Sequence, residues 1–137
     1  MEAVWQSILA GAPVLLLHVA VALAMLVISV VAYVWITPWE DLKLVRQGNK
    51  AAAIALAGIF LGLAIPLAST LAGSVNVWDI ILWGILTLVL QIVTFKIIDL
   101  ILRDLPGRIE KGDVAAGIVL AGAKLSVAII VAAAVSG

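Results

Sequence analysis

The sequence has 137 residues, of which 66% are hydrophobic and only 12% are charged, and its formal net charge is zero. A soluble domain carries about 25% charged residues, so this composition, with a mean hydropathy of +1.32, indicates a protein that needs hydrocarbon as its solvent. Zero net charge predicts no nucleic-acid partner, and a single histidine without cysteine predicts neither disulfides nor a zinc site.

Four segments are long and apolar enough to cross a bilayer, which takes roughly 20 mainly apolar residues. They cover residues 13–36, 51–72, 77–102 and 114–135. Hardly any polar face remains on them for water, so they do not resemble the helices of a soluble bundle. The prediction is an all-α polytopic membrane protein with four transmembrane helices, in a single integral membrane domain over residues 1–137.

The first span holds His18, which either senses protons or simply bonds to a local acceptor. Tyr33 and Trp35 stand near its end, where aromatic side chains favour the membrane–water interface. All basic residues of the connections lie in 37–50 and 103–113. The positive-inside rule therefore predicts that both connections are cytoplasmic and that both termini lie outside.

An approximate repeat relates residues 48–58 to residues 112–122. Each copy opens with a glycine, Gly48 or Gly112, followed by a plausible helix N-cap, Asn49 or Asp113. Each repeat, about 13–72 and about 77–135, contains two spans, so both copies run in the same direction. The prediction is two parallel-repeat helical hairpins related by an axis along the membrane normal.

The second and fourth spans carry small residues at helical spacing, which lets membrane helices pack closely. Gly58 and Gly62 form one such pair, and Gly117 and Ala121 begin a small-residue stripe in the fourth span. We expect a homo-oligomer, most simply a dimer, packed through these faces.

Polar side chains within the spans predict two clusters. Gln91 and Lys124 each lie about 16 Å from the predicted cytoplasmic end of their helix. With Thr87 and Thr94 they are expected to form a buried polar site, although Gln91 as helix–helix glue and Lys124 as a snorkelling lysine remain open. Near the cytoplasm, the 3-4 spacing of three charges predicts an ion-pair ladder, formed by Lys96, Asp99 and Arg103.

An ordered set of short motifs along nearly the whole chain resembles the YjfL-like family of small bacterial inner-membrane proteins. The motifs are Ile36-Thr37-Pro38 with Glu40, Gly48-Asn49-x-Ala51-Ala52, Leu61-Gly62, Pro66-Leu67, Ser74 before Asp79, Trp83-Gly84, Gln91 and Ala115-Ala116-Gly117. The resemblance implies four spans and an inner-membrane location, and it implies no established activity. Lys124 departs from the family pattern, in which a small residue is expected.

Phosphate loops, nucleophile elbows and metalloprotease motifs are missing from the sequence, so we expect neither enzyme activity nor a cofactor. Two functions remain open. The polar stripe and Lys124 favour a homo-oligomeric channel or permeation module. The mixed-charge cytoplasmic connections and small-residue faces favour a non-catalytic scaffold, in contact with membrane lipid, that docks a cytoplasmic protein partner.

Overall fold

The computed structural model describes residues 1–37 and 41–136, and these residues form helices and short turns without strands. Pro38 and Glu40, two residues of the family-like motifs, lie outside the described residues. Four helices are long and apolar enough to cross a membrane, as predicted: α1 (Glu2–Ile36), α3 (Lys50–Gly73), α4 (Val77–Ile101) and α6 (Val114–Ser136). The two short helices are α2 (Asp41–Arg46) and α5 (Leu105–Glu110).

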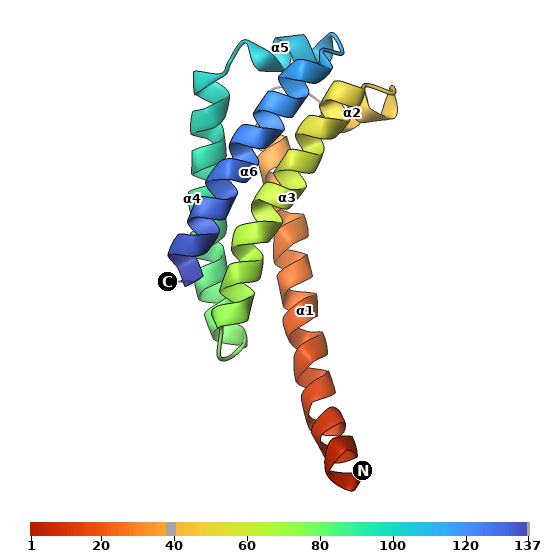
Figure 1. The fold of residues 1–137 in the computed structure, drawn as a ribbon, viewed down its shortest axis with the longest axis vertical. Helices are drawn as coiled ribbons and strands as arrows, with labels where there is room; N and C mark the ends of the chain where they lie inside the picture. The colour runs from red at the N-terminus through yellow and green to blue at the C-terminus, as the bar shows by residue number, and fades with distance from the viewer. Residues whose placement is uncertain (38–40, 137) are drawn as a thin grey trace.

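The long helices alternate in direction along the chain (Figure 1). Helices α2 and α5 lie at one end of the bundle, and both termini point toward the opposite end. Helices α3 and α6 run parallel to one another, side by side along most of their length. This direction is the one that parallel repeats require, while the superposition of the two halves stays a prediction.

The turns that precede α3 and α6 have the same local structure. Gly48 and Gly112 adopt φ values of +86° and +85°, a region that side chains with a Cβ rarely enter. The next residue caps the helix in each case. The side chain of Asn49 accepts a backbone N–H bond of 3.0 Å from three residues ahead, and that of Asp113 accepts the corresponding bond of 3.3 Å.

The two capping residues differ in one side-chain group: Asn49 has an amide nitrogen where Asp113 has a second carboxylate oxygen, and each of these groups has its own partner. The amide of Asn49 also donates to the carbonyls of Ile109 and Glu110, at 2.7 and 3.3 Å, and so ties the first turn to the second. Asp113 has no such donor, and it pairs instead with Arg108 at 2.6 Å. The hydrogen bond from Arg108 holds the pKa of Asp113 below its usual value. The stabilisation from this pair is therefore present at neutral pH and is lost as the pH falls through that lowered pKa.

The small residues pack inside one protomer. A Cβ added to Gly58 would lie 2.7 Å from the Cα of Ala121, and one added to Gly117 would lie 2.5 Å from the carbonyl oxygen of Ala51. Gly62 faces an aromatic ring of α4 in the same way. The expectation that these faces join two protomers is corrected: parallel α3 and α6 approach so closely that the faces are already covered within the chain.

Helix α1 is longer than the predicted span, because it begins at Glu2 rather than near residue 13. Its 35 residues extend about 52 Å, whereas the hydrocarbon core of a bilayer is about 30 Å thick. The first half of α1 projects beyond the bundle (Figure 1). Its second half packs on α3 and α4 and carries its buried residues, which include Ser29, Val30 and Tyr33.

Candidate functional site

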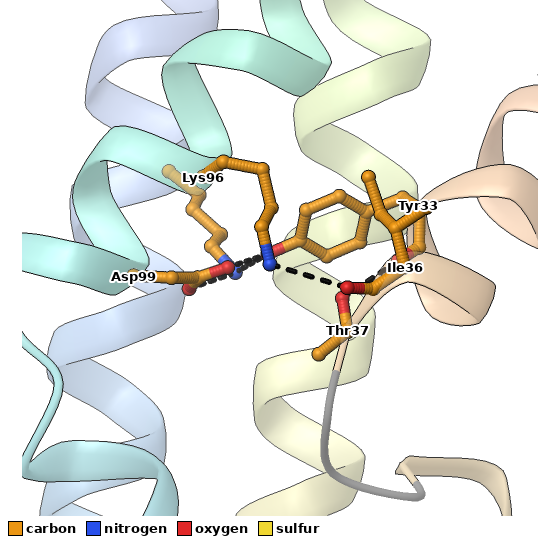
Figure 2. Close-up of polar contacts among 6 residues, drawn as sticks. Tyr33, Ile36, Thr37, Lys96 and Asp99 are labelled. Carbon is orange, nitrogen blue, oxygen red and sulfur yellow. Dashed lines mark hydrogen bonds and ion pairs between the residues drawn. The ribbon is translucent and has the colours of Figure 1, made fainter.

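Three polar side chains from three helices meet inside the bundle: Tyr33 of α1, Asp99 of α4 and Lys124 of α6. They are 0%, 5% and 1% exposed. The Nζ atom of Lys124 lies 2.6 Å from the hydroxyl of Tyr33 and 3.0 Å from Oδ1 of Asp99. The Tyr33 hydroxyl in turn donates to Oδ2 of Asp99, which lies beside it (Figure 2). We call these three residues the ion-pair cluster.

Aromatic rings surround the ammonium group of the cluster. Nζ of Lys124 lies 4.7 Å from the ring centre of Tyr33 and 5.4 Å from that of Phe95. The two rings pack edge to face, with centres 5.6 Å apart, and Phe95 is fully buried. The negative faces of aromatic rings attract a cation, so the two rings add to the contacts that the ammonium group makes with Tyr33 and Asp99.

The direction of the helices explains why Lys124 contacts Asp99 and not Gln91. Side chains on a helix lean toward its N-terminus, and α6 runs opposite to α4. Lys124 therefore leans toward the C-terminal end of α4, where Asp99 lies. Gln91 stands two turns earlier on α4, about 12 Å away along the helix. Gln91 and Lys124 lie at a similar distance from the ends of their helices, but their side chains do not meet.

The four residues of the predicted polar site bind separate partners. Gln91 donates to the carbonyl of Gly62 at 2.9 Å, while Lys124 belongs to the ion-pair cluster. Thr87 bonds to the hydroxyl of Thr70 at 3.3 Å. Thr94 donates to the carbonyl four residues earlier in its own helix, at 2.8 Å. The single site that the sequence predicted is therefore not formed by these contacts.

Gln91 has a specific structural task. Pro66 has no backbone N–H, so the carbonyl four residues before it, that of Gly62, loses its partner within α3. The Nε2 atom of Gln91 supplies the missing donor from α4, and Gln91 is fully buried. A backbone carbonyl left unpaired in hydrocarbon is costly, so the proline of α3 and the amide of α4 form a matched pair.

This pairing predicts a coupled effect of substitutions. Gln91→Met should destabilise the protein by about 1–3 kcal/mol, because it leaves the Gly62 carbonyl buried without a donor. In a Pro66→Ala background the same change should cost less, because alanine restores the N–H within α3. The measurement is a double-mutant cycle of unfolding free energies in detergent. If Gln91→Met lowered the unfolding free energy equally in both backgrounds, Gln91 would not be compensating for the N–H that Pro66 lacks.

The predicted ladder of Lys96, Asp99 and Arg103 is not formed by the contacts of these residues. Asp99 turns inward to the ion-pair cluster, because a buried cation is available there. Lys96 donates to the carbonyl of Ile36 at 3.3 Å and links α4 to the end of α1 (Figure 2). Arg103 is exposed in the turn that follows α4.

The sequence reasoning missed Tyr33, which it placed among the interfacial aromatic residues. A usable signal was present: Asp99 and Lys124 carry opposite charges on neighbouring apolar spans, and such charges usually pair. His18 is only partly buried on α1 and is not among the three residues that form the ion-pair cluster. In the described part of the chain, no group of three or more His, Asp or Glu side chains is placed to hold a metal ion.

Comparison with known proteins identifies the family. Residues 7–135 match the family described as Domain of Unknown Function (DUF350). The chain is 37% identical over 71 residues to proteins described as UPF0719 inner membrane protein YjfL, from Escherichia coli strain K12 and from Escherichia coli O157:H7. These alignments cover 52% of this chain and 54% of each relative, so the chain spans about half the length of the curated relatives it matches.

No solved structure shows significant similarity to the chain. The relatives carry an inner-membrane description, and the four apolar helices agree with it. The resemblance that the sequence motifs indicated is thereby confirmed. The chain is a multi-pass inner-membrane protein that belongs to the Domain of Unknown Function (DUF350) family.

Proposed function

We propose that the protein is a non-catalytic, homo-oligomeric permeation module whose ion-responsive element is the ion-pair cluster of Tyr33, Asp99 and Lys124. The observation that carries the proposal is the burial of an Asp–Lys pair, 5% and 1% exposed, inside a bundle of mainly apolar helices. Ionisable groups within membrane spans are rare, and they mark ion and proton pathways in many membrane proteins.

The energetics support a role beyond holding the helices together. A buried ion pair must offset the loss of hydration of both charges, and well-packed apolar replacements are often as stable or more stable. The cluster also joins α1 to α4 and α6 close to the end where α1 stops. A change in the charge of either partner would therefore loosen the attachment of α1. This coupling is what a gate requires, because α1 has few other buried contacts.

A pore would have to form between copies of the chain. Large buried side chains fill the interior of the bundle, among them Tyr33, Phe95 and Ile59, and four helices enclose little further space. Long apolar side chains on α1 and α4 remain exposed and are available for contacts between protomers. A dimer is the simplest such assembly.

We further propose that both termini lie outside, because the connections rich in lysine and arginine stay in the cytoplasm. A cysteine introduced at Gln47 should then resist a membrane-impermeant thiol reagent added to intact cells, while one at Val75 should react. The reverse pattern of labelling would overturn the orientation.

A scaffold that docks a cytoplasmic protein is the second candidate. The observation that favours it is that Tyr33, Asp99 and Lys124 contact one another and so link three helices, as a purely structural contact between helices would. The charged surfaces of α2 and α5 lie at the proposed cytoplasmic end, where a partner would bind.

Ion flux into proteoliposomes separates the two functions. Purified wild-type protein should conduct ions above the level of empty vesicles. The paired variant Asp99→Asn with Lys124→Met removes both charges together, and it should change the flux at least about tenfold while the assembly stays intact. Lys111→Met, in an exposed turn, is the matched control and should leave the flux unchanged.

The outcomes are distinct. Wild-type flux equal to that of empty vesicles would reject the permeation module and favour the scaffold. Flux that is present but unaltered in the paired variant would separate conduction from the ion-pair cluster. Static light scattering of the same samples reports the oligomeric state.

A further inference from the structure

A small pocket lies at the end of the bundle away from α2 and α5. Its volume is about 150 Å³. The end of α3 contributes Ser69 and Thr70, the turn after it contributes Ser74, and α4 contributes Asp79 and Trp83. Val135, near the end of α6, lines the third side. These polar side chains play no part in the ion-pair cluster.

The carboxylate of Asp79 is held in place but is only partly used. Its Oδ2 atom accepts the backbone N–H of Val75 at 3.1 Å, and its own N–H donates to the side chain of Asn76 at 3.0 Å. Among the described residues, Oδ1 of Asp79 makes no hydrogen bond. The turn therefore presents one fixed carboxylate oxygen at the edge of the pocket.

No lysine or arginine side chain stands near this carboxylate. All eight lysine and arginine residues lie on α2, α5 and their flanking turns, at the start of α3, or in the halves of α4 and α6 nearest that end. The C-terminal ends of α3 and α6 add partial negative charge at the pocket. The N-terminus of α4, which carries partial positive charge, also lies here. The side chains of Asn76 and Asp79 accept backbone N–H bonds at this end and so offset part of that charge.

The other polar groups of the pocket act as hydrogen-bond acceptors. Ser74 donates its hydroxyl proton to the carbonyl of Thr70 at 2.6 Å, and Thr70 donates toward the carbonyl of Pro66 at 3.1 Å. Their oxygen atoms keep lone pairs that can accept further bonds. Trp83 stands four residues after Asp79, one helical turn along the same face, and offers an aromatic ring to a cation.

We propose that this pocket binds a primary ammonium group. Such a group carries one positive charge and three N–H donors, which match one carboxylate oxygen, the hydroxyl acceptors and the aromatic ring. The same chemistry has two sources: the head group of phosphatidylethanolamine and a free alkylamine outside the membrane. The inference does not depend on the proposed permeation function.

The test for a free amine uses the full chain in detergent with fluorotryptophan labels. The ¹⁹F resonance of Trp83 is assigned by its loss in Trp83→Phe. Methylammonium chloride should shift this resonance to saturation, and sodium chloride at equal ionic strength should not. Asp79→Asn keeps an acceptor for Val75 but removes the charge, so it should weaken binding at least about tenfold.

The test for the lipid source places the same labelled protein in nanodiscs. Discs containing phosphatidylethanolamine should shift the Trp83 resonance relative to phosphatidylcholine discs, and Asp79→Asn should abolish the difference. A shift with methylammonium alone assigns a free amine, and a shift with the lipid alone assigns the head group. Trp78→Phe, outside the pocket, and Glu2→Gln on α1 are matched controls that should change neither response.

Three results would overturn the assignment: no shift with either probe, an equal shift with sodium, or full binding by Asp79→Asn. Circular dichroism of Asp79→Asn checks that its turn and helices are retained, so a loss of binding in that variant is not mistaken for unfolding.

Discussion

Lys124→Met alone should destabilise the protein by about 3–5 kcal/mol, the cost of breaking a buried ion pair by removing one partner. Asp99 would remain buried at 5% exposure with a carboxylate that has lost the ammonium 3.0 Å away. The Tyr33 hydroxyl would still donate to it, but a single neutral donor does not replace a charge. Asp99→Asn alone should be destabilising for the complementary reason.

The paired variant, Asp99→Asn with Lys124→Met, should recover most of that loss, because it leaves no uncompensated charge in the core. The measurement is reversible unfolding in mixed micelles for the four members of the cycle, with Lys111→Met as the control for loss of a lysine. Additive costs of the two single changes would mean that the two groups do not act as a pair.

Gly117→Ala should destabilise the protein by about 1–3 kcal/mol, and Gly117→Leu by more, since small-to-large changes in a packed interface force the backbones apart. The added Cβ would lie 2.5 Å from the carbonyl oxygen of Ala51, an atom of the α3 backbone that cannot swing away. The result is measured as the unfolding free energy in detergent.

Gly122 provides the matched control on the same helix. A Cβ at Gly122 meets nothing within 4 Å, so Gly122→Ala should be neutral or slightly stabilising. The two experiments also separate packing within a protomer from packing between protomers. If the loss caused by Gly117→Ala depends on protein concentration, the α3–α6 contact joins two chains rather than one.

Hydropathy and spacing predicted the elements of this fold well, because membrane spans and helix caps are local properties. The four spans and the two capped turns at Gly48 and Gly112 follow from residues that are neighbours in the sequence. The start of α1 did not follow, since hydropathy reports where a helix meets lipid and not where the helix itself begins.

The side-chain partners were harder to predict, because they depend on how helices are rotated and which way each one runs. Lys124 and Gln91 share a depth measured along the backbone, but opposite helix directions send the lysine toward Asp99. The role of Gln91 depends on which α4 residue faces the carbonyl freed by Pro66. Tyr33 looks interfacial by its sequence position, and only the packing of three helices shows it to be buried.

The Pro66–Gln91 pair has a consequence for how sequences of this kind can diverge. A chain that acquires the proline without an amide on α4 loses a backbone hydrogen bond in hydrocarbon, while a chain that loses the proline no longer needs the amide. If the amide is gained first, the Gly62 carbonyl can accept it as a second bond and is never left unpaired, so the order of the two changes matters. In an alignment of relatives, the two positions should therefore vary together, and the amide without the proline should be the commoner intermediate.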